Sequence, residues 1–412
     1  MQIDRANSCQ KNSILFNRFI SLLIFVFFFL VVVVPNSFRF ITMPLFLFLG
    51  SFSFFKVRTF NRNLLLIWLL GSFITLFYIF IGLSKCYSGA ILQVIFVYIV
   101  SPFIWILILS FIFTKFDLKS ILNFFFSFSL IGAISVPLFL IIFLLYGPNV
   151  LTWLIEEPNA VFTSGAAGVT MHVMGSLAFA VCGFFYVPTI INSLFLRSII
   201  SFTFIIAVVI SGRAALFISL FIGIFLNILI SLRNSRINLF FLVLFLILVG
   251  GIFYLFSLVF KFDIFIAFSN YVNKILEMGG QERIIQARAL IQGIYSNLFL
   301  GAGHGVGVDV IRNSQFPWRY ELLYLATLYR VGLIGFIVYS LPSFLVIIKY
   351  LEFSKDKSQL WLHLVDRFML AGFIATIVIS ATNPYLESFE FQWMFWGPVV
   401  YFIKRREVLL SR

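Results

Sequence analysis

Residues 63–82 of the chain read NLLLIWLLGSFITLFYIFIG, a stretch that contains no charged side chain. A helix needs about 20 apolar residues to cross the hydrocarbon core of a bilayer, so this stretch is long enough to span one. Similar runs recur along the whole sequence and predict about twelve membrane-spanning helices. The expected spans are 14–34, 40–55, 63–82, 89–113, 118–146, 169–191, 195–210, 214–231, 238–260, 320–348, 361–381 and 389–403. We therefore expect an all-α, polytopic transmembrane helical bundle.

The composition of the chain agrees with this prediction. Of its 412 residues, 62% are hydrophobic and 11% are charged, and the mean hydropathy is +1.10. So few polar side chains cannot cover a soluble globule, and no soluble domain of ordinary size fits between the apolar runs. We expect a single integral membrane domain over residues 1–412. The three cysteines have no paired spacing, so they predict neither a disulfide framework nor a zinc site.

The basic residues, which give a net charge of +14, lie in short clusters between the apolar runs. Membrane topology explains this distribution better than a nucleic-acid surface does, so we expect no nucleic-acid partner. If the N-terminus is cytoplasmic, most of the clusters lie on the cytoplasmic side, and the C-terminus is cytoplasmic too. The first apolar run is longer than a signal-peptide core and is interpreted as a retained helix.

Two long loops are expected on the outer side of the membrane, at 147–168 and at 261–319. Long loops carry function more often than short ones. The second loop contains residues 279–307, GGQERIIQARALIQGIYSNLFLGAGHGVG, which concentrate arginine, histidine and glycine in an otherwise apolar chain. We expect the chemistry of the protein to lie near this stretch.

Residues Gln281 to Tyr295 of this loop have the spacing of a helix. The apolar side chains expected on one face of this helix are Ile284, Ala287, Ile291 and Ile294. Arg288 lies at the edge of that apolar stripe. A helix that lies along the outer membrane surface would direct this guanidinium toward lipid headgroups or a membrane-embedded cavity.

Arginines on the outer side are candidate ligands for phosphate. Arg213, in Ser-Gly-Arg between two apolar segments, opens a helix at the membrane boundary, where a guanidinium is costly unless it faces protein, water or an anion. Guanidinium binds phosphate oxygens bidentately, and a helix N-terminus adds its positive end. Arg213 and Arg288 together would make a diphosphate clamp. Arg283, Arg312 and Arg319 could assist it, although each of these three alone is more typical of a solvated charge. The alternatives are a snorkelling Arg213 and ordinary surface ion pairs for the loop arginines.

Two residues are candidates for a general base. Glu321 opens the span after the large loop, where an acid should face the bundle interior or a water-filled cavity, and it could take a proton from a sugar hydroxyl. The alternative is an ion pair of Glu321 with Arg319 or Arg330. His304 lies among glycines that allow a ligand to approach closely. It could act as a base, as a donor to phosphate or as a plain loop histidine.

Nucleotide-binding, nucleophile-elbow and metal motifs are missing from the sequence, which favours a reaction that uses neither metal nor cofactor. Arginines would then neutralise a leaving diphosphate in place of a divalent cation.

Four segments, in their order along the chain, resemble the O-antigen polymerase and O-antigen ligase superfamily. They are SGRAALFI at 211–218, ERIIQARALIQGIYSNLFLGAGHGVG at 282–307, YELLYLATLYRVGLIGF at 320–336 and ATNPYLESFEFQWMFW at 381–396. The resemblance covers about 170–403, whereas the first six spans are similar to the family only in hydropathy. It implies that Arg213 and Arg288 match the family's diphosphate-contacting arginines. Glu321 stands where ligase-like members carry a histidine, so His304 remains the alternate base.

The resemblance also implies an activity and an architecture. An O-antigen polymerase is a glycosyltransferase of the bacterial inner membrane, similar to the GT-C class B architecture, with its active site on the periplasmic face. Its donor and acceptor are undecaprenyl-diphosphate-linked glycans, whose repeat units it joins into the lipopolysaccharide O-chain. Membrane lipid and a chain-length regulator are its other expected partners.

Two alternatives are kept. An O-antigen ligase, which moves the finished polymer to lipid A core, differs only in its acceptor. A flippase or transporter of lipid-linked polysaccharide repeats belongs to another class, and would favour charged groups along a path through many spans and paired broken helices. The unexplained charges of this chain gather on one side, which favours an enzyme site at one interface.

Overall fold

The computed structural model of the chain describes residues 2–35, 37–57, 60–146, 190–211, 282–312, 316–354 and 360–410, with short pieces that include 160–162 and 169–171. Several predictions of the sequence lie wholly or mostly outside these residues. They are the spans at 169–191, 214–231 and 238–260, the loop at 147–168, the first part of the loop at 261–319, and Arg213.

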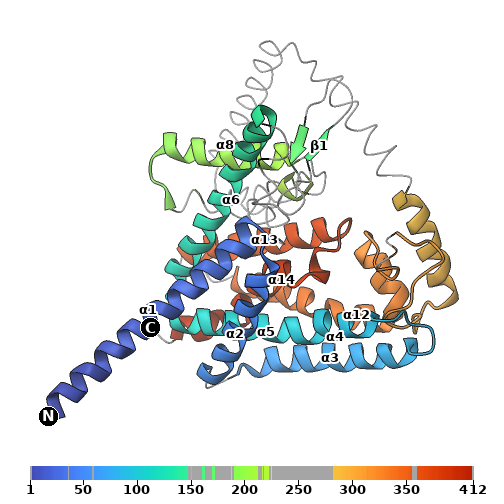
Figure 1. Ribbon diagram of the computed structural model, residues 1–412, viewed down its shortest axis with the longest axis horizontal. Helices are drawn as coiled ribbons and strands as arrows, with labels where there is room; N and C mark the ends of the chain where they lie inside the picture. The colour runs from blue at the N-terminus through green and yellow to red at the C-terminus, as the bar shows by residue number, and fades with distance from the viewer. Residues whose placement is uncertain are drawn as a thin grey trace.

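Helices make up most of the described chain (Figure 1). Their bounds are α1 (Gln2–Val33), α2 (Arg39–Lys56), α3 (Arg62–Gly82), α4 (Ala90–Ile95), the π-helical turn η1 (Phe96–Val100), α5 (Ser101–Lys115), α6 (Leu118–Tyr146), α8 (Leu194–Ile210), α12 (Leu323–Phe353), α13 (Leu360–Ser380), the short 3₁₀ turn η4 (Tyr385–Glu387) and α14 (Phe389–Leu410). Residues 282–296 form a further helix, as their spacing predicts.

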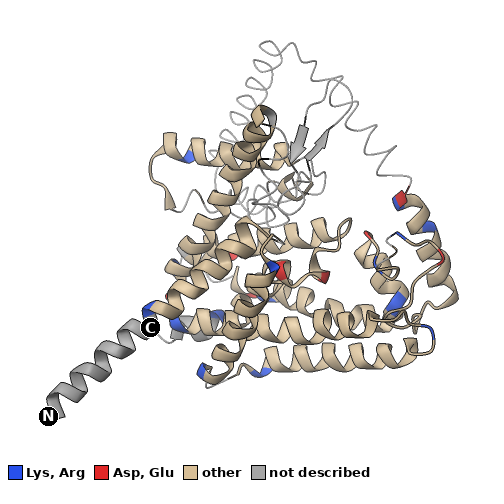
Figure 2. Ribbon diagram, viewed as in Figure 1, with Lys and Arg blue, Asp and Glu red and all other residues tan. Residues whose placement is uncertain are grey.

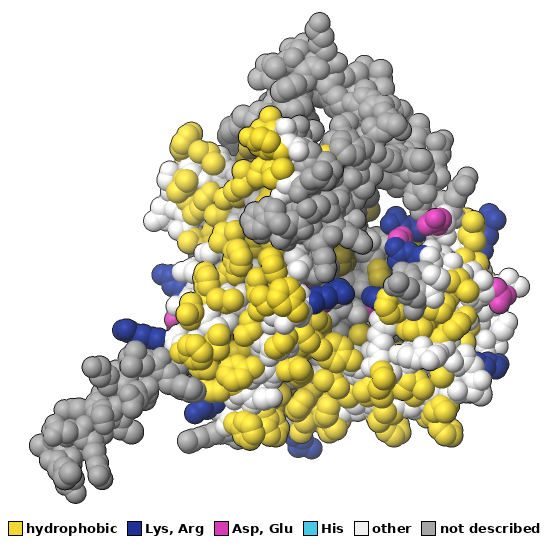
Figure 3. Space-filling view, viewed as in Figure 1, with side chains coloured by type: hydrophobic (Ala, Val, Ile, Leu, Met, Phe, Trp, Pro, Cys, Tyr) yellow, Lys and Arg dark blue, Asp and Glu magenta, His cyan; other side chains and the backbone are white. Residues whose placement is uncertain are grey.

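Six segments of the described chain are long and apolar enough to cross a membrane, and they indicate a membrane protein. They are Arg39–Lys56, Arg62–Gly82, Ala90–Lys115, Leu118–Phe143, Leu323–Phe353 and Leu362–Ser380. Figure 3 shows apolar side chains over the surface of the bundle, and Phe55 and Phe80 are 80% and 76% exposed. Such a surface is typical of a protein that faces lipid.

Aromatic rings pack the centre of the bundle. The ring of Trp105 in α5 is fully buried, and the rings of Phe27, Phe28 and Phe46 lie around it with centroids 5.2–5.9 Å away. Its indole Nε1 donates to the backbone oxygen of Phe389 at 2.7 Å. Because a buried indole N–H needs an acceptor, this bond fixes α5 against the start of α14.

α12 consists of two helical segments that meet at Gly332, where φ is 58° and ψ is −172°. The break frees backbone groups, and the loop after helix 282–296 binds them. Ala302 and Gly303 donate to the backbone oxygens of Tyr329 and Arg330, each at 2.8 Å. Unpaired backbone groups at membrane depth are costly, so the loop and the break stabilise each other. The span predicted at 320–348 is confirmed as an apolar segment long enough to cross a membrane, and the break at Gly332 within it was not predicted.

The same loop marks one end of the bundle, which we call the loop end. Here α3 ends, α4 and α12 begin, and Tyr87 donates from its backbone to the oxygen of Gly305 at 3.1 Å. In the described residues, charged side chains are sparse along the spanning helices, and many lie at the loop end around helix 282–296 (Figure 2).

Within the described residues, one β-hairpin stands among the helices. β1 (Ala160–Phe162) pairs antiparallel with β2 (Val169–Met171), with Ala160 opposite Met171. The sequence predicted a loop over the first strand and the start of a helix at residue 169. The helical class is therefore confirmed for the bundle, whereas the start of the expected span at 169–191 is a strand.

Candidate functional site

Helix 282–296 packs on the loop end through a face that the sequence did not predict. Gln286, Leu290 and Ile294 are buried, with exposed fractions of 2%, 0% and 7%. Ile284 and Ile291, which belong to the expected apolar stripe, are exposed. The sequence predicted the stripe but not the face that meets the protein, because apolar residues lie on both sides of this helix, and spacing alone does not tell a protein-facing side from a lipid-facing one.

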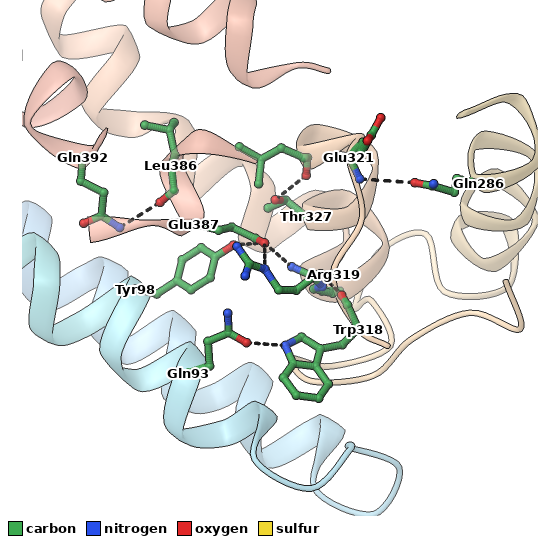
Figure 4. A network of polar contacts seen from close by, with 12 residues as sticks. Gln93, Tyr98, Gln286, Trp318, Arg319, Glu321, Thr327, Leu386, Glu387 and Gln392 are labelled. Atoms are coloured by element: carbon green, nitrogen blue, oxygen red, sulfur yellow. Dashed lines mark hydrogen bonds and ion pairs between the residues drawn. The ribbon is translucent and has the colours of Figure 1, made fainter. Parts of the chain in front are cut away.

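Glu321 lies between two arginines. Its Oε2 is 2.5 Å from the Nε of Arg283, and its Oε1 is 2.6 Å from an Nη of Arg312. The backbone amide of Glu321 donates to the side-chain oxygen of Gln286 at 3.3 Å (Figure 4). Three separate pieces of chain therefore meet at this carboxylate: helix 282–296, the loop that follows it and the residue that precedes α12. The side chains of Arg283 and Arg312 are 36% and 38% exposed, and that of Glu321 is 17% exposed.

Arg330 and Glu387 form a second group of charges, inside the protein. The guanidinium of Arg330 donates to Oε1 of Glu387 at 2.7 Å and to the backbone oxygen of Trp318. Glu387 also accepts from the hydroxyl of Tyr98 at 3.2 Å, and its other oxygen is 3.6 Å from the Nε of Arg319 (Figure 4). The side chains of Arg330 and Glu387 are 3% and 6% exposed. Because both charges are removed from water, each one needs the other as its counter-ion.

His304 lies in the interior of the loop end and is 1% exposed. Its Nε2 is 2.8 Å from the hydroxyl of Tyr339, which in turn lies 2.7 Å from the hydroxyl of Thr75. Burial, with a smaller contribution from the charge of Arg330, lowers the pKa of His304 to about 3. The imidazole is therefore neutral at physiological pH. Its burial and its tyrosine partner favour a packing role over that of a base open to substrate.

The site residues predicted from the sequence thus fall into four groups. Arg283 and Glu321 are in direct contact. His304 belongs to a different network, and Arg288 lies on the exposed side of helix 282–296, where it contacts no described residue by ion pair or hydrogen bond. Arg213 lies outside the described residues.

Sequence reasoning missed Glu387 and the contact of Arg312 with Glu321. Arg312 was expected as an assisting arginine or as a solvated loop charge, and it contacts the candidate base. Glu387 lies in a segment that carries the family resemblance, but its partner Arg330 is distant along the chain. A signal for the pair was present, because an arginine inside an apolar run needs a counter-ion, and a glutamate just before a span is a suitable one.

An apolar cavity of about 420 Å³ lies between α3, η1, α12, α13 and α14. The residues that line it include Trp68, Phe395 and Trp396. Leu323, two positions after Glu321 in the sequence, also lines it. The hydroxyl of Tyr339 and the amide of Gln392 add polar groups to this wall. A cavity of this character is suited to a hydrocarbon chain rather than to a sugar.

The described residues contain no group of three or more histidines, cysteines or acids that could hold a metal ion. The chain matches no protein-family model, and a comparison with curated proteins finds no significant match.

Proposed function

We propose that the protein is a membrane glycosyltransferase of the O-antigen polymerase kind. It would join undecaprenyl-diphosphate-linked oligosaccharide repeat units into lipopolysaccharide O-chain, in the bacterial inner membrane with its loop end facing the periplasm. The observation that carries the proposal is the meeting of Glu321 with Arg283 and Arg312 at the loop end of an apolar bundle. A carboxylate beside guanidinium groups supplies both a proton acceptor and ligands for a diphosphate.

The proposed step is a single displacement. A hydroxyl oxygen of the acceptor sugar attacks the anomeric carbon of the donor glycan, and the bond from that carbon to the diphosphate oxygen breaks. The hydroxyl proton passes to Glu321, and undecaprenyl diphosphate leaves with the bonding electron pair. Guanidinium groups would bind the negative charge that develops on the leaving group: Arg283, which lies beside the base, and Arg288 and Arg213, the two arginines that the resemblance implies.

The cavity beside α12 supports a lipid-linked substrate. Leu323, two positions after Glu321 in the sequence, lines its apolar wall, so a ligand with its diphosphate near this carboxylate could place part of a polyprenyl chain there. The exposed apolar side chains Leu298, Phe299 and Leu300 lie in the turn after helix 282–296 and give this end of the molecule a lipid-compatible surface.

Deletion of the gene in its host tests the proposal against its alternatives. A polymerase deletion should leave lipopolysaccharide with one repeat unit, visible as a single short band on a gel. Core without any O-chain would instead indicate a ligase. Lipid-linked repeats retained on the cytoplasmic side would indicate a flippase.

A further inference from the structure

We infer that Arg283 and Arg312 form a diphosphate-binding site that the carboxylate of Glu321 fills when no substrate is bound. The inference rests on the proposed function and adds an exchange to it. A diphosphate binds to the two arginines in place of the carboxylate, and Glu321 is thereby released to act as the base. Arg312 gains a role in binding substrate.

The two ion pairs have the geometry of such a site. Each guanidinium contacts a different oxygen of the carboxylate, Arg283 through Nε at 2.5 Å and Arg312 through Nη2 at 2.6 Å. A guanidinium carries five N–H donors, so each arginine has donors beyond the one that faces Glu321. Both arginines are more than a third exposed, so a ligand can reach them from outside the protein.

The carboxylate can leave while the backbone stays in place. The backbone amide of Glu321 is bound to the side chain of Gln286, which is 2% exposed and belongs to the same helix as Arg283. Release of the carboxylate therefore needs a change of side-chain rotamer and no movement of α12. Such a change is small compared with the opening of a lid or a loop.

A diphosphate competes well for the two arginines. It carries more negative charge than a carboxylate and offers more oxygens, and guanidinium binds phosphate oxygens in bidentate geometry. Once displaced, Glu321 lies beside the bound diphosphate without a guanidinium on either oxygen, and it can accept the proton of the attacking hydroxyl. After transfer, loss of that proton lets Glu321 return to the arginines, which favours departure of the polyprenyl diphosphate product.

Pyrophosphate binding to the purified full-length protein tests the exchange without any transfer reaction. Glu321→Gln keeps the shape of the side chain but removes the competing charge, so it should bind inorganic pyrophosphate about tenfold or more tightly than the wild type. Addition of Arg312→Gln to this variant should abolish the increase in affinity. The matched control is Glu282→Gln, which removes the same charge from an exposed residue next to Arg283 and should leave affinity within about twofold.

If Glu282→Gln and Glu321→Gln increase the affinity for pyrophosphate equally, net charge alone explains the increase and the inference is overturned. Unchanged affinity in Glu321→Gln, or no pyrophosphate binding in either protein, would also overturn it, provided that gel filtration and thermal unfolding show a folded variant. Failure of the exchange and failure of the proposed function give different results. Tighter binding in Glu321→Gln without any polymer made by the wild type would keep the exchange and reject the polymerase. Polymer formation by the wild type without tighter pyrophosphate binding in Glu321→Gln would keep the polymerase and reject the exchange.

Discussion

Replacement of Glu387 by glutamine should strongly destabilise the protein, because it leaves Arg330 charged and buried. The two side chains are 3% and 6% exposed and 2.7 Å apart, and removal of one partner of such a pair costs about 3–5 kcal/mol. Arg330→Met should cost less than Glu387→Gln, since Glu387 keeps Tyr98 and Arg319 as partners. Replacement of both residues by methionine removes both charges and should cost less than either single change.

Equilibrium denaturation by SDS in mixed micelles, followed by far-ultraviolet circular dichroism, measures these free energies. The matched control is Lys349→Gln, which breaks an ion pair with Glu352 whose side chains are 30% and 37% exposed. That change should cost about 1 kcal/mol or less. If Glu387→Gln destabilises the protein no more than Lys349→Gln does, the buried pair does not hold α12 to η4, and the reasoning is refuted.

Two further predictions concern the loop end. Gly332→Ala should destabilise the protein by about 1–3 kcal/mol or more in the same assay, because φ is 58° there and an added Cβ would meet the backbone of Phe299. The control is Gly71→Ala in α3, where an added Cβ meets no atom, and this change should be neutral or stabilising. The pKa of His304 is lowered from 6.5 to about 3, so only the unfolded chain binds a proton as pH falls below 6.5, and stability should drop by about 1.4 kcal/mol per pH unit. His304→Gln should remove this share of the pH dependence between about pH 7.5 and 5.5, and an identical slope in the variant would contradict the buried neutral imidazole.

The spanning helices could be predicted from the sequence because a long apolar run is a strong local signal. The run over α3 begins after Asn61, whose side chain caps the helix by accepting from the amide of Asn63 at 2.9 Å. The break at Gly332 could not be predicted in the same way. The residues around it are as apolar as those of an unbroken helix, and the backbone groups that make the break tolerable come from a distant loop.

The candidate site was predictable in part. The position of Glu321 before a span, and of Arg283 within a helical segment, indicated charged groups at one end of the bundle. The contact between them needs the packing of helix 282–296, whose buried face is set by Gln286 and Leu290 rather than by its most apolar side. The contact of Arg330 with Glu387, which are far apart in the chain, leaves no spacing pattern, so its only signal in the sequence is the need of an arginine inside an apolar run for a counter-ion.

Transfer by the purified protein in lipid vesicles tests the central claim most directly. Vesicles that contain undecaprenyl-diphosphate-linked repeat units should yield a ladder of longer lipid-linked chains, with one undecaprenyl diphosphate released for each bond formed. Glu321→Gln should make no ladder, although it still binds the donor. Lipid-linked repeats that cross the vesicle membrane without being joined, or a full ladder from Glu321→Gln, would contradict the account.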